Sequence, residues 1–387
     1  SIIEGETALH GLFGFNSIDP YEGDISEELE NLSRKIFRLE NIEPASHTFT
    51  HPFYWGKIIN DDLDPNYRLQ VKNYDFSLDR EIRGSLEYIN TRLAPKAKQA
   101  NMIFWSGDCL PTQTTLDYMY KNNVLQINGG DTVIVNDQPW LSNIAPYGIK
   151  RGDYYQIFTG AQNENVFTND WIGPFWGFKK VIQTFELTDK PKRFKPIDIY
   201  YHTYSGSKRA SLNALHKIYK WAIKQDVMPI YTSKYIPKVM DFYEVSLANE
   251  KDTWLIRGSK NLKTVRIEKD QGVDFGASHG IVGMKTHESG RYIHLNQDEK
   301  QILVLSQERK NQNYLIDANV ALVHANRYKK SIDLLFQGEV AAEIRYHVAK
   351  GCELNAMPIA EEQSKKDGVV LLKYTSNKDV HVIVTCE

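Results

Sequence analysis

The pattern of apolar residues changes near residue 245, and this change constrains the fold more than any other feature of the sequence. Before it, strand-like and helix-like segments alternate, whereas after it the chain reads as short strands separated by turns. Alternation of strands and helices is typical of a parallel sheet with crossover helices, either open or closed into a barrel. Closely spaced short strands favour a β-sandwich. The sequence therefore predicts two domains, residues 1–245 and 246–387.

The first domain carries both helical and strand-like segments. Apolar residues recur at helical spacing in three segments, 27–40, 78–93 and 210–224. Asp24 or Ser26 is a plausible N-cap for the first of these helices. Short apolar runs without helical spacing predict strands at 42–46, 101–106, 125–127, 197–202 and 228–231, and the last of them is followed by a short helix that ends near 243.

The second domain is expected to contain strands alone. Each predicted strand is a run of β-branched and other apolar residues bounded by turn formers. The runs cover residues 253–257, 264–268, 292–295, 302–306, 331–336, 342–348, 369–374 and 380–386.

The composition excludes some classes of protein. Lys and Arg total 47 and Asp and Glu total 49, so the chain lacks the basic excess expected of a nucleic-acid-binding protein. No apolar run approaches the roughly 20 residues that a membrane-spanning helix needs. We therefore expect no nucleic-acid partner and no membrane span. The 22 Tyr and 7 Trp fit a sugar-binding groove, but they fit a β-rich core equally well.

The cysteines leave one question open. Three are too few for a disulfide scaffold. Cys352 and Cys386 could pair if the protein is exported, whereas Cys109 stands alone. The chain also begins abruptly with the strand-like Ser1-Ile2-Ile3, so we expect it to be a piece of a longer protein.

Two histidines four residues apart form the sharpest motif. His47 and His51 lie in Ser46-His47-Thr48-Phe49-Thr50-His51-Pro52, directly after a predicted strand. Imidazoles at this spacing can converge on one divalent ion, and neutral imidazole suits Zn, Co, Ni or Fe better than Mg or Ca. The alternative is a pair of ordinary surface or hydrogen-bonded core histidines.

Other ionisable residues also follow predicted strands. Asp108 comes after strand 101–106, Asp131 comes after Asn128-Gly129-Gly130, and His202 closes strand 197–202. The carboxyl ends of parallel strands meet at one edge of a sheet or barrel, so these side chains are expected to gather with the two histidines. Taken singly, the aspartates could cap turns and His202 could bond to a backbone carbonyl.

The histidine motif resembles the metal-binding motif of the polysaccharide deacetylase (NodB-homology) superfamily. Further blocks resemble the deacetylase domain of Pel exopolysaccharide-modifying proteins, and together they place the resemblance over residues 1–243. These blocks are residues 3–6, 45–48 with 51–55, 105–108 with 111–112, 127–132, and 201–202 with 204–205.

The resemblance implies an α/β fold: a distorted (β/α) barrel of polysaccharide-deacetylase type, here followed by the β-sandwich, which would bind carbohydrate or support the barrel. His47 and His51 match the metal ligands, and His202 matches the general acid that a neighbouring carboxylate, Asp131 or Asp108, would keep charged. Substrate contacts fall to Trp105, Asp108 and Tyr147.

The implied reaction is metal-dependent de-N-acetylation of an N-acetylhexosamine-containing exopolysaccharide. The metal would be Zn, with Co or Ni as substitutes. The implied partners are the N-acetylated polysaccharide and other exopolysaccharide-export proteins, and the implied location is periplasmic or extracellular.

One family feature has no counterpart in this sequence. The family's first strand carries an Asp pair that supplies a metal ligand and the general base, yet only 46 residues precede His47 and no Asp-Asp or Asp-x-Asp occurs among them. We therefore expect the first strand and the third, Asp ligand to lie upstream of Ser1, and the chain as given to be inactive.

Two other functions stay open. One is a non-catalytic carbohydrate-binding protein with a degenerate deacetylase domain. The other is a metal-dependent hydrolase that acts on an unrelated substrate and uses the same two histidines.

Overall fold

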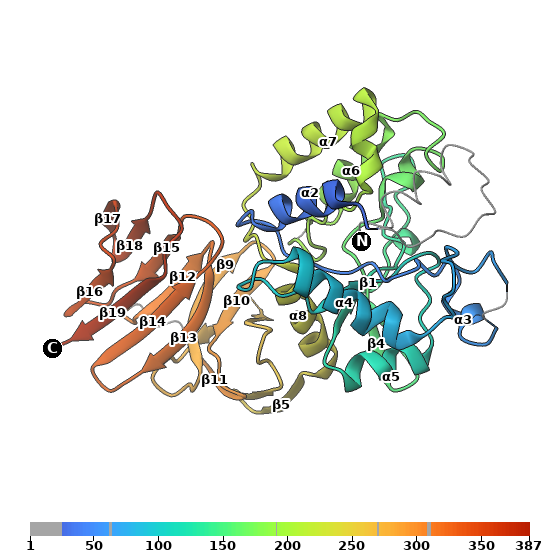
Figure 1. Cartoon of the computed structure of the whole chain (residues 1–387). Helices are drawn as coiled ribbons and strands as arrows, with labels where there is room; N and C mark the ends of the chain where they lie inside the picture. The colour runs from blue at the N-terminus through green and yellow to red at the C-terminus, as the bar shows by residue number, and fades with distance from the viewer. Residues whose placement is uncertain (1–24, 62–63, 191, 269–270, 308–310) are drawn as a thin grey trace. The chain divides into compact units, whose positions relative to one another are not determined.

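The computed structural model describes residues 25–61, 64–190, 192–268, 271–307 and 311–387 (Figure 1). The chain divides into two compact units between Gln225 and Asp226. This division precedes helix α8 (Thr232–Glu244), whereas the predicted boundary follows it. The strand-like segment Ser1-Ile2-Ile3 and the candidate N-cap Asp24 lie outside the described residues.

Helices and turns of helix make up most of the regular structure in the first unit. The elements are α2 (Glu27–Phe37), α3 (Trp55–Ile58), η1 (Arg80–Gly84), α4 (Ser85–Tyr88), η2 (Ile89–Leu93), α5 (Gln113–Lys121), η3 (Leu141–Asn143), η4 (Glu164–Phe167), η5 (Gly177–Lys180), α6 (Val181–Leu187), η6 (Thr203–Ser207) and α7 (Arg209–Ala222). Within the described ranges, every helix is too short or too polar to cross a membrane.

Capping explains where the first described helix begins. The Ser26 hydroxyl accepts a hydrogen bond from the Leu29 amide at 3.3 Å, so Ser26 is the N-cap of α2. The predicted helices at 27–40, 78–93 and 210–224 are all present, although the first and last end two or three residues early.

A short parallel core organises the first unit. β1 (Met102–Phe104) pairs in parallel with β2 (Leu125–Ile127), and Ser46 forms an isolated parallel bridge with Ile103 on the other side of β1. The remaining pair, β3 (Gly148–Arg151) with β4 (Tyr154–Ile157), is an antiparallel hairpin. The carboxyl ends of three chain segments therefore meet at one edge.

The predicted fold class is wrong. The described residues form a mixed α/β structure whose sheets are mostly antiparallel, with no closed barrel. The predicted strand at 197–202 is not formed, and two hydrogen bonds there each join a backbone amide to a carboxylate. Gly160 N donates to Asp198 at 2.9 Å, and His202 N donates to Glu164 at 2.9 Å. The predicted strand at 228–231 is also absent.

Two cores hold the first unit together. One joins the helix at 78–93 to β1 and α5, and its largest members are Trp55 and Trp105, whose rings meet edge to face at 5.0 Å. The other packs α6 against α7, which Figure 1 shows lying together, through Phe185 and Ile218. The first core lies directly behind the edge where β1 and β2 end.

After α8, the second unit is built from strands. They are β5 (Ser246–Glu250), β6 (Thr253–Arg257), β7 (Thr264–Ile267), β8 (Gly272–Val273), β9 (Ile281–His287), β10 (Gly290–Leu295), β11 (Lys300–Ser306), β12 (Tyr314–Ala318), β13 (Ala321–Arg327), β14 (Ser331–Gln337), β15 (Glu343–His347), β16 (Cys352–Met357), β17 (Glu362–Lys366), β18 (Val369–Lys373) and β19 (Val380–Cys386). All eight strands predicted from the sequence are present.

These strands form three sheets. A seven-stranded sheet has the order β17-β18-β15-β12-β9-β10-β7, and the four-stranded sheets are β5-β6-β11-β8 and β13-β14-β19-β16. Alternate residues are buried in β11, β14, β15, β18 and β19, because one face of each of these strands covers a core. One core contains residues of β12, β15 and β18 together with β14 and β19, and a second contains residues of β9 and β10 together with β6 and β11.

A disulfide joins the first residue of β16 to the last residue of β19. Cys352 and Cys386 are directly opposite each other on β16 and β19 and are bonded. Cys109, in the first unit, is the free cysteine.

Candidate functional site

The two motif histidines lie together on the loop that follows Ser46. Their ring centroids are 5.0 Å apart and the rings are nearly perpendicular. Two imidazoles that share a tetrahedral zinc ion, with metal–nitrogen distances of about 2.0–2.1 Å, have ring centroids roughly 5 Å apart. The ring separation therefore fits a shared metal ion.

A backbone carbonyl fixes the proton on His47. Nδ1 of His47 is 2.8 Å from the carbonyl oxygen of Phe104, at the end of β1. Because a carbonyl only accepts hydrogen bonds, Nδ1 carries the proton and the lone pair of the neutral ring lies on Nε2. Metal-binding histidines are commonly oriented in this way, with the second nitrogen bonded to a carbonyl or carboxylate.

The loop between the histidines has an unusual backbone. Thr48 has φ of 73° and His51 has φ of 51°, both in the left-handed region. This region is rare for a β-branched residue such as Thr48, which is also fully buried. Backbone strain of this kind collects at functional sites, where surrounding contacts hold it in place.

The block that follows β1 packs against the far end of this loop. Gly107 has φ of +57°, and a Cβ there would lie 2.4 Å from Cα of Phe53. The Ser106 hydroxyl donates to the carbonyl of Pro52 at 2.8 Å, and the amide of Asp108 donates to the carbonyl of Phe53 at 2.9 Å. The sequence block at 105–108 therefore fixes the chain just after His51.

Asp108 makes the contacts of a residue that caps a turn. Its Oδ1 accepts hydrogen bonds from the amide of Leu110 at 3.0 Å and from that of Trp55 at 3.4 Å. Burial raises the pKa of Asp108. These hydrogen bonds are those of an aspartate that caps a turn, the alternative role considered for it above. The contact with substrate stays a prediction.

Trp105 and Tyr147, both predicted to contact substrate, differ in their exposure to solvent. Trp105 is fully buried and its indole N–H donates to Gln126 at 2.8 Å, which places the ring in the core and out of reach of a sugar. Its predicted role in substrate binding is corrected accordingly. Tyr147 is partly exposed, and its hydroxyl donates to the carbonyl of Phe194.

Asn128 connects β1 and β2 to the segment that carries His202. Its side-chain amide donates to the carbonyl of Trp105 at 2.6 Å and to the hydroxyl of Tyr200 at 2.9 Å. His47 bonds to the preceding carbonyl of the same strand end, and the ring of Tyr200 lies 5.8 Å from that of His202. The structure thus brings His202 to the edge where the histidine loop begins.

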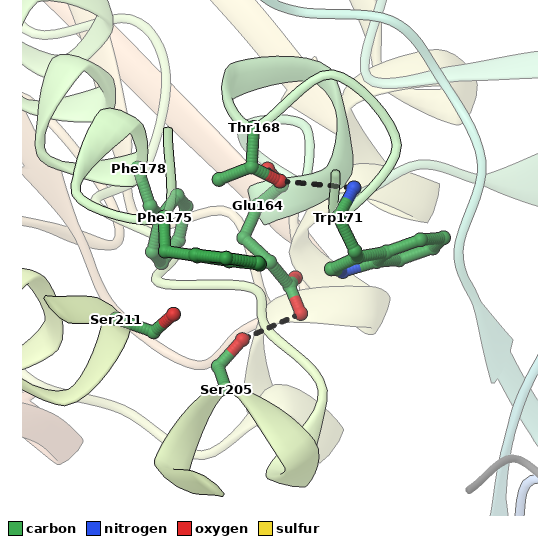
Figure 2. Close-up of a pocket in the computed structure, with 7 residues that line it drawn as sticks. All are labelled: Glu164, Thr168, Trp171, Phe175, Phe178, Ser205 and Ser211. Atoms are coloured by element: carbon green, nitrogen blue, oxygen red, sulfur yellow. Dashed lines mark hydrogen bonds between the residues drawn. The ribbon is translucent and has the colours of Figure 1, made fainter. Parts of the chain in front are cut away.

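The carboxylate that faces His202 is Glu164, not Asp131. Oε1 and Oε2 of Glu164 are 3.1 and 3.3 Å from Nδ1 of His202. Oε1 also accepts from the Ser205 hydroxyl at 2.9 Å, the bond that Figure 2 draws between these two residues. Asp131 instead accepts a hydrogen bond from Gln162 at 2.8 Å and is exposed. The role predicted for Asp131, orienting the imidazole, therefore belongs to Glu164.

Glu164 is a buried anion stabilised by its neighbours. Burial raises its pKa, but hydrogen bonds and the charge of His202 outweigh this effect, so the net pKa of Glu164 is lowered. The carboxylate accepts from Nδ1–H of His202, so Nδ1 is the ring nitrogen that Glu164 holds. Sequence reasoning missed Glu164 because it lies in η4, away from any predicted strand end.

A small pocket borders this pair. Figure 2 shows the Glu164 carboxylate between Phe175 and Trp171, with Ser205 below it. The space is sufficient for about one water molecule. It is too small for a sugar ring, so a polysaccharide would have to approach His202 from outside this pocket. The indole of Trp171 meets the His202 ring edge to face at 5.3 Å.

The two motif histidines are the candidate metal ligands that lie together in the described part of the chain. In it, no group of three or more His, Cys, Asp or Glu side chains is placed to hold a metal ion. His47 and His51 by themselves provide two imidazole nitrogens, and further positions would fall to water, substrate or residues outside the described ranges.

Comparison of the chain with protein-family models, with curated proteins and with solved structures finds no match. The family resemblance drawn from the sequence therefore stays a prediction, and the function rests on the geometry of the site.

Proposed function

We propose that the protein is a metal-dependent hydrolase that removes N-acetyl groups from an N-acetylhexosamine-containing exopolysaccharide, outside the cytoplasm. The observation that carries this proposal is the pairing of His47 with His51, with ring centroids 5.0 Å apart and Nδ1 of His47 bonded to a carbonyl. These two imidazoles would hold the divalent ion, with zinc, cobalt and nickel as the candidates.

The reaction needs four things from the site. When bound, the ion would polarise the amide carbonyl and activate water. The attacking water would pass its proton to a general base, the carboxylate that the family resemblance implies. His202 donates a proton from Nε2 to the leaving amine, which is too basic to depart unprotonated. Glu164 holds Nδ1 of His202 and so orients the imidazole.

The test is acetate release from N-acetylhexosamine oligomers by the full-length natural protein, with and without Zn²⁺ or Co²⁺. We expect activity that a chelator abolishes and that added metal restores. His47→Ala and His51→Ala should each lower metal affinity and reduce activity to background. His202→Asn should lower kcat about 10²–10⁴-fold with unchanged metal content. His216→Ala, on the exposed face of α7, is the matched control.

Two results would contradict the proposal. Chelator-resistant acetate release would rule out the metal, and wild-type kcat in His47→Ala would rule out this residue as a ligand. A screen of N-acetylated against O-acetylated sugars and peptides tests the substrate class.

A second candidate is a non-catalytic protein that binds carbohydrate. The observation in its favour is that the described residues bring two metal ligands together rather than three. It predicts oligosaccharide binding that is unaffected by chelation and by His202→Asn, without acetate release.

A further inference from the structure

A buried glutamate lies beneath the loop that carries the two histidines. Glu81, in η1 (Arg80–Gly84), has no solvent exposure. Its Oε2 accepts hydrogen bonds from the amides of Phe49 at 2.9 Å and Thr50 at 2.8 Å. These two amides belong to the residues between His47 and His51, so the carboxylate contacts the middle of the loop.

The second carboxylate oxygen is bonded as well. Oε1 of Glu81 accepts from the hydroxyl of Thr50 and from that of Tyr74 at 3.0 Å. All four partners can donate, which matches the acceptor-only chemistry of a carboxylate. A buried charge normally destabilises a fold unless such bonds compensate it, so this residue is costly to keep for packing alone.

A second hydrogen-bonded contact lies one turn further along the same helical stretch. The hydroxyls of Ser85 and Ser46 are 2.7 Å apart, and the Ser46 hydroxyl accepts from the amide of Thr48 at 3.0 Å. The helical stretch at 78–93 is therefore hydrogen-bonded to the loop at its start, through Ser85, and at its middle, through Glu81.

The loop needs this support because its backbone is strained. Thr48 and His51 both have positive φ, a conformation that persists only where surrounding contacts over-determine it. Without the bonds to Phe49 and Thr50, the loop would relax and the two imidazoles would separate.

We infer that Glu81 is a positioning residue of the two-histidine site: by accepting hydrogen bonds from Phe49 and Thr50 it holds His47 and His51 in the geometry that binds a metal ion, and it thereby sets the affinity for that ion. This inference rests on the proposed function, because it assumes that the two histidines bind metal.

The test compares Zn²⁺ affinity in full-length natural protein carrying Glu81→Gln or Glu81→Leu. Gln can keep all four bonds, since its carbonyl accepts from the two amides and its NH₂ donates to the two hydroxyls. We expect Glu81→Gln to bind Zn²⁺ within about threefold of wild type. Leu can make none of the bonds and should weaken binding about 10–100-fold, the usual effect of removing a group that orients a metal ligand.

The matched control is Glu87→Leu, the same change at an exposed position of α4 in the same helical stretch. Thermal unfolding separates a loss of affinity from a loss of fold. If Glu81→Leu does not fold, Thr50→Val removes one donor to Glu81, and we expect it to weaken Zn²⁺ binding several-fold. The absorption spectrum of bound Co²⁺ should also change in the Leu or Val variant and not in the Gln variant.

The outcomes separate the two claims. If wild type and His47→Ala bind Zn²⁺ alike, the proposed function fails and this inference fails with it. If wild type binds through His47 and the folded Leu or Val variant binds equally well, the inference alone is overturned. Equal weakening in Gln and Leu variants would also overturn it, because hydrogen bonding would then not be the cause.

Discussion

The contact between Glu164 and His202 makes the stability of the fold depend on the ionisation of a single carboxylate. Glu164 is almost fully buried, while the side chain of His202 is one-quarter exposed. Because hydrogen bonds lower the folded-state pKa of Glu164 below its unfolded value, its ionised form stabilises the fold. That contribution is fully present above the unfolded pKa of about 4.3 and is lost as the pH falls through the folded-state pKa.

The prediction at this scale concerns Glu164→Gln. At pH 7 the change should lower the free energy of unfolding by about 1–3 kcal/mol, because charged hydrogen bonds to His202 and Ser205 are replaced by neutral ones. The difference from wild type should shrink as the pH falls below the unfolded-state pKa, and it should vanish below the lowered folded-state pKa, where the Glu164 carboxyl is neutral as well. Urea unfolding at several pH values measures it, and a difference that does not vary with pH would contradict the assignment.

At the scale of elements, the close packing of the segment after β1 against the chain after His51 requires a glycine at position 107. Gly107 is needed there for two reasons, its φ of +57° and the 2.4 Å approach of Phe53 Cα to any Cβ. The obstructing atoms are backbone, so rotation of a side chain cannot relieve the overlap.

We therefore expect Gly107→Ala to lower the free energy of unfolding by about 1–3 kcal/mol or more, and to weaken metal binding by displacing the chain after His51. Gly56→Ala is the control, because a Cβ at Gly56, within α3, meets nothing within 4 Å. Thermal unfolding and Zn²⁺ titration of both variants test this. Equal behaviour of the two would show that the close approach does not matter.

The comparison of predicted and observed elements shows what sequence patterns can and cannot reveal. The helices at 27–37 and 209–222 and the strands of the second unit follow from apolar spacing, which is a local property. The strand expected at 197–202 is absent; there Asp198 accepts from the amide of Gly160 and the amide of His202 donates to Glu164, and no spacing rule signals such long-range bonds.

The site shows the same limit. The adjacency of His47 and His51 follows from their spacing in the chain, whereas Glu164 and Glu81 reach their partners across 38 and 31 residues. Asp131 has the sequence context of a catalytic carboxylate, because it follows a strand and a Gly-Gly turn. In the structure, however, it accepts a hydrogen bond from the side-chain amide of Gln162. Long-range partners of this kind depend on the tertiary fold and have no signature in a single sequence.

At the scale of the whole molecule, each of the four hydrophobic cores found in the described residues lies within one unit. The disulfide also lies entirely in the second unit, where it links β16 to β19. Stabilisation by the bridge is therefore expected to act on that unit, and the two-histidine site belongs to the other.

The last prediction follows from this separation. A bridge across 34 residues stabilises by about 3–4 kcal/mol through the restricted unfolded chain. In the double variant Cys352→Ser, Cys386→Ser we expect faster hydrogen exchange in β14, β16 and β19, with exchange in β1, α5 and the helix at 78–93 unchanged. Cys109→Ser in the first unit is the control. Mass spectrometry of peptides from both units measures this, and accelerated exchange around β1 in the double variant would show that the units are coupled in stability.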